Sequence, residues 1–137
     1  MPFSITGKQE MIDRFNRLKQ NLPPLVASAL YLEVNVEATE VKKRTPVWNP
    51  ARNAGPEVVK GALRASVRVD GPFIEGGFIY ARILAGGSMA PYALYVHEDL
   101  EAFHATGEAK FIESVILESR PFMASRVAKR IELNKAF

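Results

Sequence analysis

Cysteine is absent from the 137 residues, so the chain has neither disulfides nor thiolate metal ligands. No apolar run approaches the roughly 20 residues that a membrane-spanning helix requires, and we therefore expect no membrane partner. Segment 1–8 lacks the basic and then apolar pattern of a signal peptide. Excess charge of one sign is also scarce, because the net charge is only +3. So small a surplus does not indicate a dedicated nucleic-acid-binding protein.

What remains is the composition of an ordinary globular domain, with 47% hydrophobic and 24% charged residues. The length suits one core, and we expect a single domain over residues 1–137. Within it, residues 1–22 form an expected N-terminal helical arm. Residues 45–61 form a long loop rich in Pro, Gly and Asn, and loops of that length are often functional.

Helical periodicity occurs twice before that loop. In residues 6–21 the stripe is Met11, Phe15 and Leu18, and Pro23-Pro24 is expected to end this helix. Residues 25–44 predict a second, stronger helix that Pro46 stops. Its core face is expected to carry Leu25, Ala29, Leu32 and Val36, and its solvent face Glu33, Glu37 and Glu40.

The second half of the chain predicts strands and then helices. Alternation over residues 66–70, with short apolar runs at 73–74 and 78–85 between glycines, indicates an antiparallel meander. A short helix over 91–98, a polar loop over 99–107 and a helix over 111–133 follow, with a kink or restart expected at Pro121. The predicted fold is α+β: an antiparallel sheet of three to four strands with a long N-terminal helix and a C-terminal helix packed on it.

Both histidines of the chain fall in one acidic segment, which contains His97, Glu98, Asp99, Glu101 and His104. These are ligand types for zinc or manganese. The spacing is not the helical pair of histidines, four apart with an intervening glutamate, that metalloproteases use. An alternative function is therefore a metal-dependent hydrolase or nuclease that uses His97, Glu98, Asp99 and His104. A solvated polar loop is the simpler interpretation of the same residues.

Two further features are candidates for contacts with a partner. Trp48 lies in the proline-rich loop, where an aromatic anchor is more plausible than a core residue. Arg52, Arg64 and Arg68 are basic residues on or near that loop, and a DNA-binding adaptor is a third hypothesis. Arginines that alternate along a strand are more often the outward side of a half-buried sheet. No Gly-x-Ser-x-Gly or phosphate-binding loop occurs.

Four segments in order carry a family resemblance. They are Lys42-Lys43-Arg44-Thr45-Pro46-Val47, then Gly61-Ala62-Leu63-Arg64-Ala65-Ser66-Val67-Arg68-Val69, then Tyr92-Ala93-Leu94-Tyr95-Val96-His97-Glu98, then Ala109-Lys110-Phe111-Ile112-Glu113. The chain resembles, over roughly residues 27–133, the small neck, minor tail and tail-completion proteins of tailed bacteriophages. It departs from that pattern where the short link after Pro-Val is expanded into Trp48 to Lys60.

The resemblance implies a virion structural protein, made in the host cytoplasm, that joins head to tail without catalysis, metal or cofactor. Its implied partners are copies of itself, in a ring of six or twelve, and neighbouring connector, tail-tube or tail-terminator proteins. Genomic DNA would pass through the lumen without sequence-specific binding. We expect partner contacts at Trp48, Arg52, Arg64, Arg68, His97, Glu98, Asp99, Glu101 and His104, with the acidic residues meeting a basic surface such as Arg64 or Arg68 of the next subunit.

Overall fold

A computed structural model describes residues 6–47, 60–101 and 107–137 of the chain. The elements are α1 (Lys8–Arg44), α2 (Ala62–Ser66), β1 (Arg68–Glu75), β2 (Phe78–Leu84), α3 (Ala93–Glu98), α4 (Phe111–Arg130) and a final 3-10 turn, η1 (Leu133–Lys135). The chain is α+β, with a long N-terminal helix, a two-stranded antiparallel sheet and a C-terminal helix.

The expected break at Pro23-Pro24 is wrong, because α1 is one helix of 37 residues with both prolines inside it. At 1.5 Å per residue its length is about 55 Å. A proline keeps a helical φ but has no N–H, so the carbonyls of Lys19 and Gln20 lose their partners four residues on. Proline at these two positions weakens the helix but does not end it.

The face of α1 that is buried also differs from the prediction. Ala27, Val34, Ala38 and Val41 are buried together with Glu33 and Glu37, which were expected to face solvent. Leu32 and Val36, expected in the core, are exposed. Ala29 is buried as expected, so the buried face overlaps the predicted one but is displaced from it, where α4 and the sheet pack against α1.

The predicted sheet of three to four strands is wrong as well, because β1 and β2 form a single hairpin. Gly71-Pro72 was expected to be a turn between two strands. The chain instead continues through it with a shift in register, so that Asp70 pairs with Arg82 and Phe73 with Tyr80. The hairpin turn is Gly76-Gly77, and both glycines have the positive φ that a tight two-residue turn requires.

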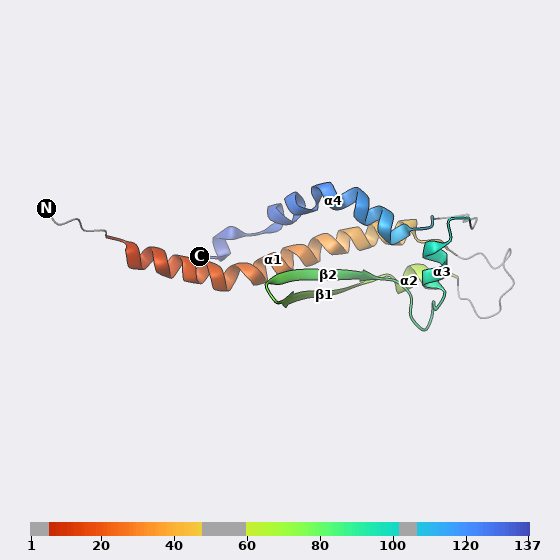
Figure 1. Ribbon diagram of the computed structural model, residues 1–137, viewed down its shortest axis with the longest axis horizontal. Coiled ribbons are helices and arrows are strands. Elements are labelled where there is room, and N and C mark those ends of the chain that lie inside the picture. The colour runs from red at the N-terminus through yellow and green to blue at the C-terminus, as the bar shows by residue number, and fades with distance from the viewer. Residues whose placement is uncertain (1–5, 48–59, 102–106) are drawn as a thin grey trace.

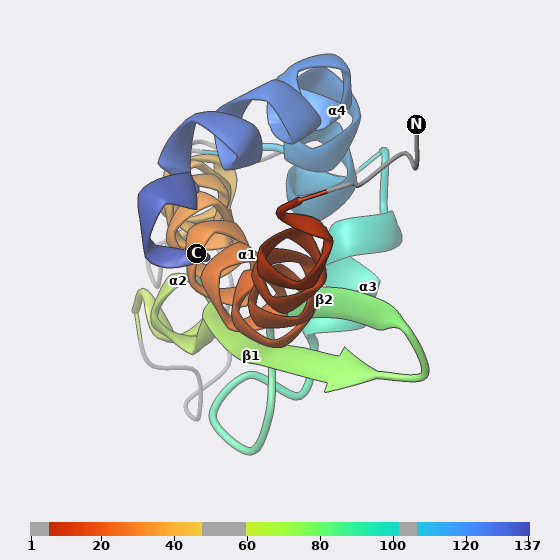
Figure 2. The same ribbon diagram turned by 90° about the vertical axis from the view of Figure 1, so that its left-hand side faces the viewer.

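The long helix α1 is the axis of the molecule, with α4 along one side and the hairpin along another (Figure 1). The view along α1 shows it between these two elements (Figure 2). The helix α4 runs antiparallel to α1, because Arg44 contacts Glu118 and Glu33 contacts Arg130. Pro121 lies inside α4, so the helix does not restart there, and the alternative of a kink stays a prediction. The N-terminal part of α1 extends beyond both neighbours, while α2 and α3 gather at its other end (Figure 1).

The apolar core is concentrated at the C-terminal end of α1. Phe111 at the start of α4 is fully buried there, next to Val41 of α1 and Val67 after α2. The buried cluster draws on the four segments that carry the family resemblance or on their neighbours, and it consists of Val41, Leu63, Val67, Ala90, Ala93, Phe111 and Val115. Residues of these segments therefore build the scaffold of the fold.

Candidate functional site

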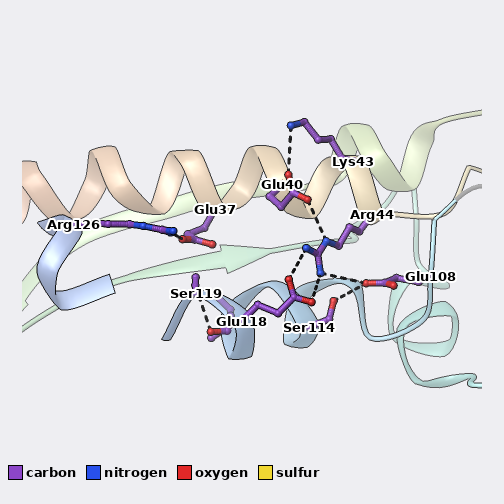
Figure 3. A network of polar contacts seen from close by, with 10 residues as sticks. Glu37, Glu40, Lys43, Arg44, Glu108, Ser114, Glu118, Ser119 and Arg126 are labelled. Atoms are coloured by element: carbon purple, nitrogen blue, oxygen red, sulfur yellow. Dashed lines mark hydrogen bonds and ion pairs between the residues drawn. The ribbon is translucent and has the colours of Figure 1, made fainter. Parts of the chain in front are cut away.

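The last turn of α1 is held by one arginine that carboxylates from several segments surround (Figure 3). Arg44 donates two hydrogen bonds to the carboxylate of Glu118 in α4, at 2.8 and 2.6 Å. Its Nε donates to Glu40 at 3.2 Å, and Glu108 lies 3.7 Å away. A planar guanidinium suits this paired geometry, which a lysine would not reproduce.

This arrangement changes how the surrounding groups titrate. Arg44 lowers the pKa of the Glu118 carboxyl, and together with Lys43 it lowers the pKa of Glu40. The pKa of Arg44 is raised, first by its hydrogen bonds to Glu118. Since each group favours the charged form of the other, the cluster acts as a structural clamp between α1 and α4 at neutral pH.

A second set of ion pairs lies further along the contact between α1 and α4. Glu33 is only 1% exposed, and its carboxylate accepts a hydrogen bond from Arg130 Nε at 2.9 Å. Arg126 reaches Glu37 at 3.3 Å and Glu33 at 3.6 Å. Figure 3 shows Arg126 directed at Glu37. Because each buried carboxylate has an arginine partner, Glu33 and Glu37 can be buried in the contact between α1 and α4, although charged residues were expected on the solvent side of this helix.

The acidic segment begins at the end of α3, where His97 is packed edge-on against the ring of Phe111. His97 Nδ1 lies 2.7 Å from one oxygen of Glu98, and the other oxygen of Glu98 pairs with Lys110. Lys110 first, and then His97, lower the pKa of Glu98. Both oxygens of Glu98 therefore have partners within the chain. These contacts connect the end of α3 to the start of α4.

The predicted metal ligands are not brought together within the part of the chain that the structure describes. Asp99 accepts a hydrogen bond from the backbone N–H of Glu101 at 3.0 Å, in a local turn. No group of three or more ligand side chains that could hold a metal occurs among the described residues. His104 lies outside those residues.

The basic candidates that the structure describes serve the fold. Arg64 donates to the carbonyl of Thr45 at 2.9 and 3.3 Å, and so binds an otherwise open carbonyl at the C-terminal end of α1. Arg68 donates to the carbonyl of Gly86 at 2.9 Å and to that of Ser66 at 3.1 Å. Both guanidinium groups therefore donate within the chain, and the expected contact of the acidic residues with Arg64 or Arg68 of a neighbour stays a prediction. Trp48 and Arg52 lie outside the described residues.

Sequence reasoning missed a surface feature of α1, an apolar stripe that is exposed towards both ends of the series but is buried at Ala29. Once α1 is seen to be continuous, the two predicted stripes join into one series spaced alternately by four and three residues. Such spacing is typical of a helix that packs on another helix. Met11 is 56% and Phe15 61% exposed, and Leu32 and Val36 are exposed as well. The series is Met11, Phe15, Leu18, Leu22, Leu25, Ala29, Leu32 and Val36.

A second apolar surface lies at the opposite end of the molecule, around α3. Leu94 and Tyr95 are 74% and 72% exposed there. Between α3 and α4 is a groove of about 480 Å³ with carboxylates at its rim. It is lined by Ala85, Ala93, Leu94, His97, Glu98, Phe111, Ile112, Glu113, Ile116 and Leu117.

Comparison of the chain with protein-family models, curated proteins and solved structures finds no match in any of the three. Among the helices of the described ranges, none combines the length and the apolar character needed to cross a bilayer. The exposed surfaces described above and the order of the four segments are the features that bear on function.

Proposed function

We propose that this chain is a structural protein of a tailed-bacteriophage virion, located in the neck or tail, where it joins head to tail by assembling into a ring. It acts through contacts alone, with copies of itself and with neighbouring connector, tail-tube or tail-terminator proteins. The DNA passes through the ring without being read. The phage context rests on the ordered segments from Lys42 to Glu113.

The observation that carries the assembly part of the proposal is the amount of exposed apolar surface. Large apolar side chains are exposed on the N-terminal part of α1, around α3 and on α4, where Leu117 and Phe122 are exposed. Monomeric proteins rarely expose large contiguous apolar patches, and groups of exposed apolar side chains are candidates for surfaces that bind other proteins. Burying one Phe, Leu or Met is worth about 1.5–3 kcal/mol.

The metal-dependent hydrolase has no comparable support. The groups that it needs at His97 and Glu98 are paired with each other and with Lys110. Replacement of His97 and of His104 by alanine, with metal analysis and an assay for nuclease activity, separates the two functions. Metal-stimulated cleavage that both substitutions abolish would replace the assembly proposal.

The proposal is tested in the phage or prophage that encodes the chain. Deletion of the coding sequence should leave filled heads and finished tails that do not join, seen by electron microscopy, and the titre should return on expression of the chain in trans. Antibody labelling should place the chain at the neck or tail. Normal particles after deletion, or absence of the chain from purified virions, would contradict the proposal.

A further inference from the structure

We infer that the arm of one copy, residues 8–20 at the N-terminal part of α1, docks in the groove between α3 and α4 of a second copy. The inference deepens the proposed function, on which it rests for its place in a virion, because it names the contact that would link neighbouring subunits. The inference is carried by two apolar surfaces that are bordered by charges of opposite sign.

Most of the arm is left uncovered by the residues that the structure describes. Every described residue from 6 to 17 is exposed, including Met11, Ile12 and Phe15. Helices of about 12–15 residues without tertiary contacts are marginal in water. At the base of the arm, Pro23 and Pro24 remove two further hydrogen bonds from the backbone. A helical arm with these properties is stabilised when its apolar side is covered.

The charges around the stripe indicate what covers it. At 100° per residue, Arg14 lies on one edge of the stripe formed by Met11, Phe15 and Leu18, and Lys8 and Lys19 lie on the other edge. The arm carries four cationic residues and two carboxylates, of which Glu10 pairs with Arg14 at 3.1 Å. The apolar stripe is therefore bordered by positive charge.

The groove has the complementary pattern. Its lining is mostly apolar and includes the buried Phe111, the half-buried Ile112 and the exposed Leu94 and Leu117. Glu98 and Glu113 are at its rim, and Glu101 lies on the adjoining surface with Leu94 and Tyr95. Lys110, which pairs with both Glu98 and Glu113, offsets only part of this charge. An apolar helix edged with cations fits such a groove both in character and in charge.

The arm and the groove lie at opposite ends of the molecule (Figure 1). With α1 about 55 Å long, a chain cannot place its arm in its own groove. The contact must therefore join two copies head to tail. A contact of this type closes into a ring when the rotation between copies permits, and otherwise extends into a filament. Pairing of two arms is less favourable, because it brings two cation-edged stripes together.

The absence of cysteine from the chain permits a direct test with single introduced thiols. We expect Met11→Cys and Leu94→Cys proteins, mixed and oxidised, to form a disulfide-linked dimer that joins the two variants. Each variant alone should give little dimer. Both positions are more than half exposed, so folding should be retained and is checked by circular dichroism. A dimer of Met11→Cys with itself in comparable yield would overturn the inference in favour of paired arms.

Sedimentation of the full chain gives an independent measurement. The double change Arg14→Glu and Lys19→Glu should raise the dissociation constant for self-association by at least about tenfold, and high salt should weaken association of the unmodified chain. The control, Lys42→Glu with Lys129→Glu, reverses two exposed charges away from the stripe and the groove and should change it less than about threefold. Equal effects of the two double variants would contradict the inference.

The outcomes distinguish the inference from the proposed function. A chain that stays monomeric at high concentration, or whose arm is captured only by another virion protein, overturns the inference. In that case virion localisation still tests the function. Head-to-tail crosslinks in a chain that is absent from particles would leave the contact standing and overturn the phage assignment.

Discussion

Glu33 carries a charge into the contact between α1 and α4, where Arg130 and Arg126 reach it from the partner helix. The arginines are partly exposed and the glutamate is not. Loss of an arginine therefore strands a buried carboxylate, whereas loss of the glutamate leaves arginines that water can solvate. The two ends of one ion pair should respond unequally to substitution.

We expect Arg130→Met to lower the free energy of unfolding by about 2–4 kcal/mol. By contrast, Glu33→Met, which fills the same space with an apolar side chain, should stay within about 1 kcal/mol of the unmodified chain. Urea unfolding of both variants checks the asymmetry. Equal losses of unfolding free energy in the two variants would mean that the loss comes from breaking the ion pair, and not from leaving a buried carboxylate without its partner.

Residue by residue, the sequence predicts the engaged arginines poorly. Arg64 and Arg68 look like the solvent side of a strand, and only the structure shows that they donate to the carbonyls of Thr45 and Gly86. Glu33 and Glu37 predict a solvent-exposed helix face, because charged side chains are usually exposed. Their partners in α4 lie about ninety residues away in the chain, and periodicity within one helix carries no information about such partners.

At the scale of the element, the arm and the body of α1 meet at Pro23-Pro24. Alanine in place of both prolines restores two N–H donors and favours the helix. We expect slower amide hydrogen exchange in peptides that cover residues 8–22, with little change elsewhere. As a control, Pro121→Ala should slow exchange in α4 instead. Unchanged exchange in the arm would show that the prolines do not limit its stability.

The elements illustrate which signals in a sequence are local. The ends of α3 and the start of α4 follow from Pro91 and from the apolar periodicity after Lys110, and the structure confirms a helix within each predicted range. Gly71-Pro72 and Pro23-Pro24 predict the ends of elements, because glycine and proline usually occur in turns and at helix ends. Pairing across the hairpin and packing on α1 hold both segments in the regular element. Tertiary contacts override these local preferences.

For the whole molecule, acid should act through the carboxyls whose pKa lies below the ordinary 4.5 in the fold: Glu40, Glu98 and Glu118. A lowered pKa contributes stability that is complete above that ordinary value and is lost as the pH falls through the folded value. We expect the urea midpoint to hold from pH 7 to about pH 5 and to fall below it. Arg44→Met should flatten this fall, since Arg44 is the main cause of two of the shifts.

The antiparallel packing of α1 and α4 determines the order in which contacts between the two ends of the chain are expected to form during folding. The contacts join residues that are 74 apart at Arg44 and Glu118, 97 apart at Glu33 and Arg130, and 115 apart at Asn21 and Ala136. The entropy lost in closing a chain segment grows with its length. We therefore expect the contacts between the two helices to form first at the Arg44 end and to open first at the other end. The residues beside the base of the arm would then be the last to become ordered.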